Sequence, residues 1–244
     1  MRRLIHGGDA ARLLGAPDLS AAADVDALVG AVRAEAGAGD AGRWVVLSGA
    51  STARFSPHAL SAAVLDAAAP RRPTCVWSAD HEAAWLNTLA CEAARSAPFV
   101  EGLAVEAVRR VLPRWTLETW KERLLALQDA LVAGGVREIR DVDPDAAEGW
   151  RALDDDGALR LDVETLLAPK GLRPALLRGA RPGEGTPRAR LIGVAWREDG
   201  GGWSAARIAE ETALAEARGF AVVRYAPSDV LRRVAGAAPP AASS

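Results

Sequence analysis

Short apolar runs of strand type alternate with amphipathic helical segments along most of the chain, and this alternation limits the folds that the sequence can adopt. Helical spacing of apolar residues, with N-cap residues such as Asp24 and Thr116, predicts the helices. About six strands separated by helix-length crossovers indicate parallel βα units, in either a doubly wound sheet or a TIM-type barrel. The predicted class is therefore α/β. The predicted strands lie at residues 44–47, 73–77, 136–141, 159–163, 190–196 and 220–225, and the predicted helices at 24–35, 56–70, 82–94, 116–134, 144–153 and 205–218.

Composition removes several classes of function from consideration. The 244 residues include 30 basic and 32 acidic side chains, a formal net charge of −2, so we expect neither a nucleic acid nor a membrane as partner. Cys75 and Cys91 are too few for a disulfide scaffold, and the N-terminus has no apolar run of signal-peptide length. We therefore expect a cytoplasmic protein with a single α/β domain over residues 1–235 and a disordered tail at residues 236–244.

The densest polar and aromatic chemistry of the chain lies in the segment SADHEAAWLNTLA, residues 78–90. This segment directly follows the strand predicted at residues 73–77 and runs into the helix predicted at residues 82–94. In α/β folds, ligands usually bind at the carboxyl ends of the strands. The segment is therefore the first candidate for a functional site.

Several passages of the sequence follow one another in the order of a known family. Asp80, Trp85, Asn87, Thr88 and Leu89 stand at or near the positions of a D-x-H-x-x-W-x-N-S-x-A-L signature. Matching passages on either side are DLS at 18–20, GRWV at 42–45, LD at 65–66, GLAVEA at 102–107, GVREIRD at 135–141, RLIGVA at 190–195 and the stretch 219–229. Over residues 13–235 the chain thus resembles the amidohydrolase superfamily, in its N-substituted formamide deformylase-like branch, the amidohydrolase 3 type.

The resemblance implies a TIM-type barrel whose strand ends hold one or two divalent metals that activate water against an amide-like C–N bond. The family's ligands include a His-x-His pair, a carboxylated Lys and further His and Asp residues. The matching positions here are Leu4 and His6 for the pair, Ala195 for the Lys and Tyr225 for a His, while Asp229 remains. His6 is expected to be solvated, on a start too short for a supported strand. We therefore expect no cofactor, with zinc or another divalent metal only if this interpretation of ligand loss is wrong.

The predicted architecture is a partial TIM-type (β/α) barrel of about six parallel strands with flanking helices, truncated relative to the family. The predicted function is that of a degenerate, catalytically inactive form of a metal-dependent hydrolase, which ancestrally cleaved non-peptide amide or formamide C–N bonds in small molecules. An open barrel exposes strand edges and apolar inner surface. We therefore expect self-association, or a partner chain that covers the open barrel.

A first alternative is a metal-free binding or regulatory module that retains the old pocket. In this hypothesis Asp80 lies beside the substrate-binding candidates His81, Trp85, Asn87 and Glu106, and the group holds a small amide-like molecule. Such a module needs the pocket but none of the metal ligands.

A second alternative is a metal-independent acid/base enzyme. Its catalytic candidates are Asp80, Glu82 and Asp141, with His81 as a further titratable group in the same pocket. This hypothesis needs Asp141, which follows a different predicted strand, to share a site with the segment at residues 78–90.

Overall fold

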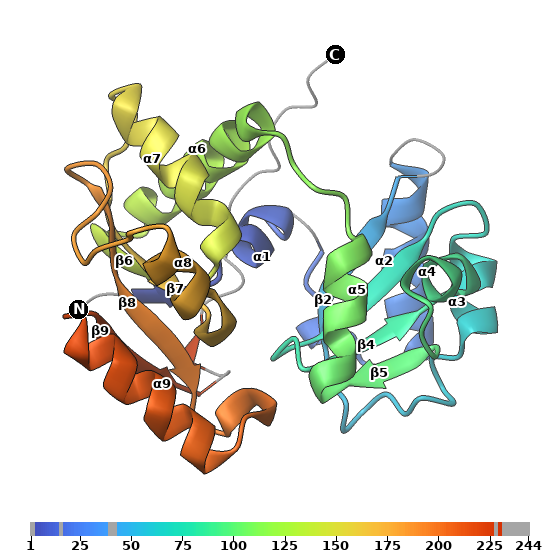
Figure 1. Ribbon diagram of the computed structural model, residues 1–244. Helices are drawn as coiled ribbons and strands as arrows, with labels where there is room; N and C mark the ends of the chain where they lie inside the picture. The colour runs from blue at the N-terminus through green and yellow to red at the C-terminus, as the bar shows by residue number, and fades with distance from the viewer. Residues whose placement is uncertain (1–2, 15–16, 39–42, 227–228, 231–244) are drawn as a thin grey trace. The chain divides into compact units, whose positions relative to one another are not determined.

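The computed structural model describes most of the chain (Figure 1). The tail predicted at residues 236–244 lies outside the described residues. In the part of the chain that is described, no helix combines the length and the hydropathy needed to cross a membrane. The described residues are 3–14, 17–38, 43–226 and 229–230.

The chain divides into two compact units, each described here by itself. The first, called the parallel-sheet unit, consists of Met1–Gly15 and Trp115–Ser244. The second, called the mixed-sheet unit, is the intervening segment Ala16–Arg114. The sequence analysis expected a single domain over residues 1–235, and the division places the segment at residues 78–90 and Asp141 in different units.

The parallel-sheet unit is built on a curled sheet of five strands flanked by helices, consistent with a partial TIM-type barrel (Figure 1). Neighbours in the order β1-β6-β7-β8-β9 all pair in parallel, so their carboxyl ends lie along one edge. The predicted α/β class is confirmed, with five strands in this sheet. The strands are β1 (Arg3–Ile5), β6 (Glu138–Asp141), β7 (Asp162–Leu167), β8 (Ala189–Arg197) and β9 (Ala221–Tyr225).

The helices of this unit begin where the sequence places caps and pack through their apolar stripes. The Thr116 hydroxyl caps α6 by accepting a hydrogen bond from the backbone N–H of Thr119 at 3.2 Å. Leu124 of α6, Trp150 of α7 and Ile139 of β6 then share one buried core. The helices are α1 (Gly7–Arg12), α6 (Leu117–Ala133), α7 (Ala147–Asp155), α8 (Leu172–Leu177) and α9 (Ala205–Ala217), with 3₁₀ turns at Pro144–Ala146, Pro169–Gly171 and Gly200–Gly202.

The mixed-sheet unit contains a separate sheet of four strands in the order β2-β3-β4-β5. β2 and β3 pair in parallel, whereas β3 with β4 and β4 with β5 pair antiparallel. The strands predicted at residues 44–47 and 73–77 are β2 and β3, so they belong to this sheet and not to the barrel-like one. The strands are β2 (Val45–Ala50), β3 (Thr74–Ser78), β4 (Ala83–Leu86) and β5 (Phe99–Glu101).

The helix predicted at residues 82–94 is wrong in its first half, because residues 83–86 form β4. A tight turn after Ser78, with His81 at φ +59°, returns the chain alongside β3, where Trp85 pairs with Val76. All four residues of β4 are buried. The helix begins only after Asn87, whose side chain caps it. Pairing with a neighbouring strand thus overrides the helical preference of an alanine-rich segment.

The helices of the mixed-sheet unit pack around a second core. Asp24 caps α2 as predicted, accepting from the backbone N–H of Ala27 at 2.8 Å. Leu28 of α2, Leu65 of α3 and Trp85 of β4 belong to the same buried cluster. The helices are α2 (Val25–Gly37), α3 (Ala62–Ala68), α4 (Thr88–Ala94) and α5 (Val105–Val111), with 3₁₀ turns at Leu19–Ala21 and Gly102–Ala104.

Candidate functional site

One face of the parallel sheet carries an apolar cluster at the positions where the resemblance places metal ligands. Alternate residues of a strand point to opposite faces. Ala195 is buried in this cluster, and Leu4 and Tyr225 are partly buried against it. The remaining members of the cluster are apolar: Val142, Leu166, Ile192, Val223 and Val230. Most of the surroundings therefore offer carbon atoms where a divalent cation needs nitrogen, oxygen or sulfur ligands.

The donors nearby do not form a metal site either. Among the residues that the structure describes, no group of three or more His, Cys, Asp or Glu side chains is arranged to hold a metal ion. Asp229, which matches a position of the motif that the chain resembles, accepts from the backbone N–H of Ala226 at 3.0 Å on the surface. The residues present thus do not fit the metal that the family would carry.

His6 has a more ordered setting than predicted. The sequence suggested a solvated residue without a supported strand, but Arg3–Ile5 form β1 and pair with β6. His6 caps α1 through Nδ1, which accepts from the backbone N–H of Asp9 at 3.4 Å and lies 3.2 Å from Asp143 Oδ2. It thus belongs to a carboxylate-rich cluster at the carboxyl ends of β1 and β6.

Asp141 is the most enclosed member of that cluster, with no exposed surface. Its Oδ1 accepts from the backbone N–H groups of Gly7 at 2.9 Å and Asp143 at 2.8 Å, and its Oδ2 from Trp150 Nε1 at 2.7 Å. A Cβ at Gly7 would lie 2.2 Å from Asp141 Oδ2, so only glycine permits this approach. The carboxyl group therefore fixes the start of α1 against β6 and α7.

The environment of Asp141 also changes its proton affinity. Burial, followed by the nearby charge of Asp143, raises the pKa of Asp141 to about 7, against the opposing effect of its three N–H donors. A carboxyl group with such a pKa exchanges protons near neutral pH, which is the property required of a general acid or base. Its complete burial, however, leaves no surface at which a substrate could meet it.

The raised pKa predicts that stability falls as pH rises. The folded protein holds this proton up to about pH 7, whereas the unfolded chain releases it near pH 4. Between these values the folded state binds more protons, so the free energy of unfolding should fall by at most about 1.4 kcal/mol per pH unit and level off above pH 7. Asp141→Asn should remove this slope in urea unfolding curves recorded across the range, whereas the exposed Glu148→Gln should retain it. Equal slopes in both variants would contradict the prediction.

In the mixed-sheet unit, Asp80 and Glu82 form the turn between β3 and β4. Asp80 Oδ1 accepts from Ser78 Oγ at 2.6 Å and from the backbone N–H of Glu82 at 3.0 Å. Ser78 Oγ in turn accepts from the backbone N–H of Ala83 at 2.9 Å. Asp80 thereby stabilises the reversal that starts β4.

His81 lies inside the unit and not at its surface. The side chain stacks on Trp77 with ring centroids 5.4 Å apart, and Nε2 lies 2.7 Å from Ser48 Oγ. Arg109 donates to the His81 carbonyl at 3.2 Å and to Glu106 at 2.9 Å, so Glu106 joins His81 through that arginine. Glu106 and His81, two of the predicted site residues on different elements, are thus connected through Arg109.

Ser48 is the contact that sequence reasoning missed. It precedes Gly49 at a register shift between β2 and β3, and 33 residues separate it from His81, so no local pattern signals the pair. The 2.7 Å distance is that of a nucleophile and its base. Ser48 and His81 are, however, only 3% and 1% exposed. The hydrogen bond between Ser48 and His81 therefore stabilises the turn in which His81 has a left-handed backbone conformation.

Trp85 and Asn87, the best-aligned residues of the signature, are completely buried. Trp85 packs against Phe99 with ring centroids 5.2 Å apart. Asn87 Oδ1 accepts from the backbone N–H groups of Thr74 at 2.9 Å and Ala90 at 3.0 Å. Its Nδ2 donates to the carbonyls of Ala69 at 3.3 Å and Arg72 at 2.9 Å. These two side chains thus connect β3, β4, β5 and α4 with the segment that follows α3.

Comparison with known proteins identifies the fold. No protein-family model matches the sequence, and no curated protein matches it. Crystal structures of uncharacterized metal-dependent hydrolases from Pyrococcus horikoshii OT3 and Pyrococcus furiosus are similar, with TM-scores of 0.68 and 0.64 and 17% and 18% identity. The aligned regions cover 92% and 93% of this chain but 52% and 54% of those proteins. The chain thus shares their fold and spans about half of their length.

Proposed function

We propose that this chain is a catalytically inactive relative of metal-dependent amidohydrolases, whose ancestral reaction was hydrolysis of amide or formamide C–N bonds in small molecules. Two observations support the proposal. The ordered motifs at residues 13–235 resemble the amidohydrolase superfamily, and the fold is similar to that of two metal-dependent hydrolases.

The observation that carries the inactive assignment is the apolar cluster at the strand ends. The methyl group of Ala195 and the side chain of Leu4 cannot bind a cation, and both pack within this cluster. A catalytic zinc site needs about three protein ligands and an open position for water. Of the family's positions on β1, β8 and β9, His6 keeps an imidazole, and its Nδ1 already accepts from the backbone of Asp9. No metal-dependent reaction step is therefore part of the proposal.

Burial weighs against the two alternatives. A binding module built on His81, Trp85 and Asn87 would need these side chains to face a ligand, but each is at most 1% exposed. Acid/base catalysis would need Asp141 to reach a substrate, but its oxygens face backbone N–H groups and Trp150. Asp80 and Glu82 lie in a surface turn, where the Asp80 carboxylate accepts a hydrogen bond from the backbone N–H of Glu82.

The proposal is tested by hydrolysis of N-substituted formamides, followed through release of the amine. We expect no turnover above the buffer rate, with or without added zinc, because no ligand set activates water. Turnover that increases with zinc and disappears with a chelator would overturn the proposal. Turnover that survives the chelator but is lost in Glu82→Gln would favour the acid/base alternative.

A further inference from the structure

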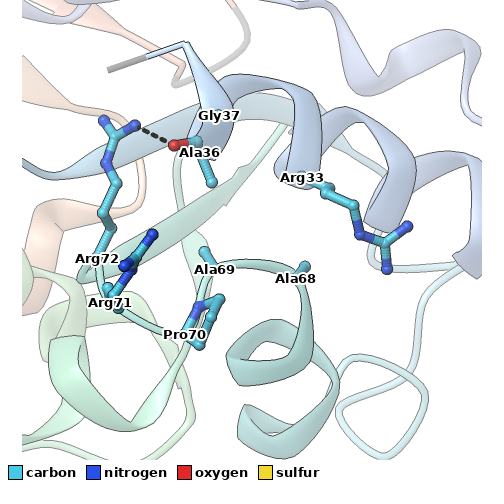
Figure 2. A pocket seen from close by; sticks show the side chains of 8 residues that line it. All are labelled: Arg33, Ala36, Gly37, Ala68, Ala69, Pro70, Arg71 and Arg72. Carbon is cyan, nitrogen blue, oxygen red and sulfur yellow. Dashed lines mark hydrogen bonds between the residues drawn. The ribbon is translucent and has the colours of Figure 1, made fainter. Parts of the chain in front are cut away.

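A cavity of about 220 Å³ lies in the mixed-sheet unit, away from the turn at residues 78–82. Figure 2 shows it between the end of α2 and the segment that leaves α3. Its walls are small side chains, including Ala36, Ala68, Ala69 and Pro70. This volume is below the roughly 300–1,000 Å³ typical of drug-sized ligands. The cavity is thus of a size for a small molecule.

Three arginines, Arg33, Arg71 and Arg72, line the cavity. Arg72 is 5% exposed, and its guanidinium group donates to the carbonyls of Glu35 and Ala36 at the end of α2, both at 2.9 Å (Figure 2). It also donates to two backbone carbonyls before β2, those of Arg43 and Trp44. Arg72 therefore offsets the partial negative charge at the end of α2.

Arg33 and Arg71 are exposed, and neither makes a hydrogen bond or ion pair with another described residue. They flank the small side chains in Figure 2, Arg71 beside Arg72 and Arg33 on the opposite side. None of the described residues that line the cavity is acidic. Among the described residues, therefore, none neutralises the charge of either arginine, and both charges can attract an anion.

We propose that this cavity binds a small phosphate monoester. A phosphate group carries a charge of about −1.5 to −2 at pH 7 and three acceptor oxygens, which suits two arginines better than a single carboxylate does. The alanines and Pro70 then form an apolar wall for the organic group. This site is independent of the proposed hydrolase ancestry, because it uses none of the residues of the strand-end cluster.

The test is isothermal titration calorimetry of the full chain with phenyl phosphate, inorganic phosphate and benzoate in phosphate-free buffer. We expect phenyl phosphate to bind more tightly than either of the others. Arg71→Ala and Arg33→Ala should each weaken its binding by about tenfold, as expected for the loss of a charged hydrogen-bonding group. Arg110→Ala is the matched control, because Arg110 is an exposed arginine of the same unit outside the cavity and makes no hydrogen bond or ion pair with another described residue.

Three results would overturn the proposal. If phenyl phosphate does not bind, the proposed site does not exist. If benzoate binds equally tightly, the site has no preference for phosphate over a carboxylate. An equal loss of affinity in Arg110→Ala and Arg71→Ala would show general attraction to a basic surface. Arg72 is left unchanged in these experiments, because its contacts with four carbonyls are structural.

Discussion

Replacing Arg72 by methionine is expected to lower the free energy of unfolding by about 3 kcal/mol. The guanidinium group is buried and donates to four backbone carbonyls, those of Glu35, Ala36, Arg43 and Trp44. Methionine fills much of the same space but leaves these carbonyls without their donor, and burial keeps water from replacing it. Urea unfolding followed by tryptophan fluorescence measures the change, because Trp77 and Trp85 lie in the same unit.

Arg71→Met is the matched control for this prediction. It removes the same charge from the adjacent position, but Arg71 is exposed and makes no hydrogen bond or ion pair with another described residue. Its cost should stay within about 0.5 kcal/mol, as for most surface substitutions. Similar losses in the two variants would mean that net charge, and not the bonds to the carbonyls, stabilises this region.

Replacing Asn87 by alanine is the second substitution with a large expected effect, also about 3 kcal/mol. Its amide accepts from Thr74 and Ala90 and donates to Ala69 and Arg72, so four buried backbone groups lose a partner together. The cap of α4 is lost in the same step. The same urea unfolding experiment gives the change in free energy.

Thr88→Ala is the control for Asn87. Thr88 is the next residue, and its hydroxyl donates to Asp66 at 2.6 Å on the surface, so its loss should cost less than about 1 kcal/mol. An Asn87→Ala protein with an unchanged free energy of unfolding would contradict the structural role of Asn87. It would instead favour the hypothesis that Asn87 binds a substrate.

Much of the fold could be predicted from the sequence where the signals are local. The caps of α2 and α6 at Asp24 and Thr116 are single residues followed by an apolar periodic stripe, and both are found where expected. β2, β3, β6, β7, β8 and β9 overlap the apolar runs that the sequence predicts as strands. Such signals depend on neighbours within one or two turns of the chain.

The division of the strands between two sheets depends on contacts that are distant in sequence. β1 pairs with β6, although the whole mixed-sheet unit lies between them in the sequence. β1 is only three residues long, so its sequence does not indicate this partner. β4 reads as helix because Ala83 and Ala84 favour helices, and only its pairing with β3 and β5 makes it a strand. The spacing of apolar residues along the sequence does not indicate which strands pair with one another.

The candidate site divides in the same way. The segment at residues 78–90 could be identified from its residue types, but the sequence does not reveal that His81 faces Ser48 and Trp77 inside the unit. Polar residues at a strand end are typical both of a ligand site and of a turn with a buried side chain such as His81. Burial distinguishes the two, and burial is a property of the folded chain.

The proposal of a chain without a catalytic metal centre is tested by the metal content of the purified full chain. The protein would be dialysed against metal-free buffer and analysed by inductively coupled plasma mass spectrometry. Since Leu4 and Ala195 stand where the resemblance places metal ligands and lie within an apolar cluster, we predict far less than one divalent ion per chain. Zinc or another divalent metal retained at one or more ions per chain would contradict the account.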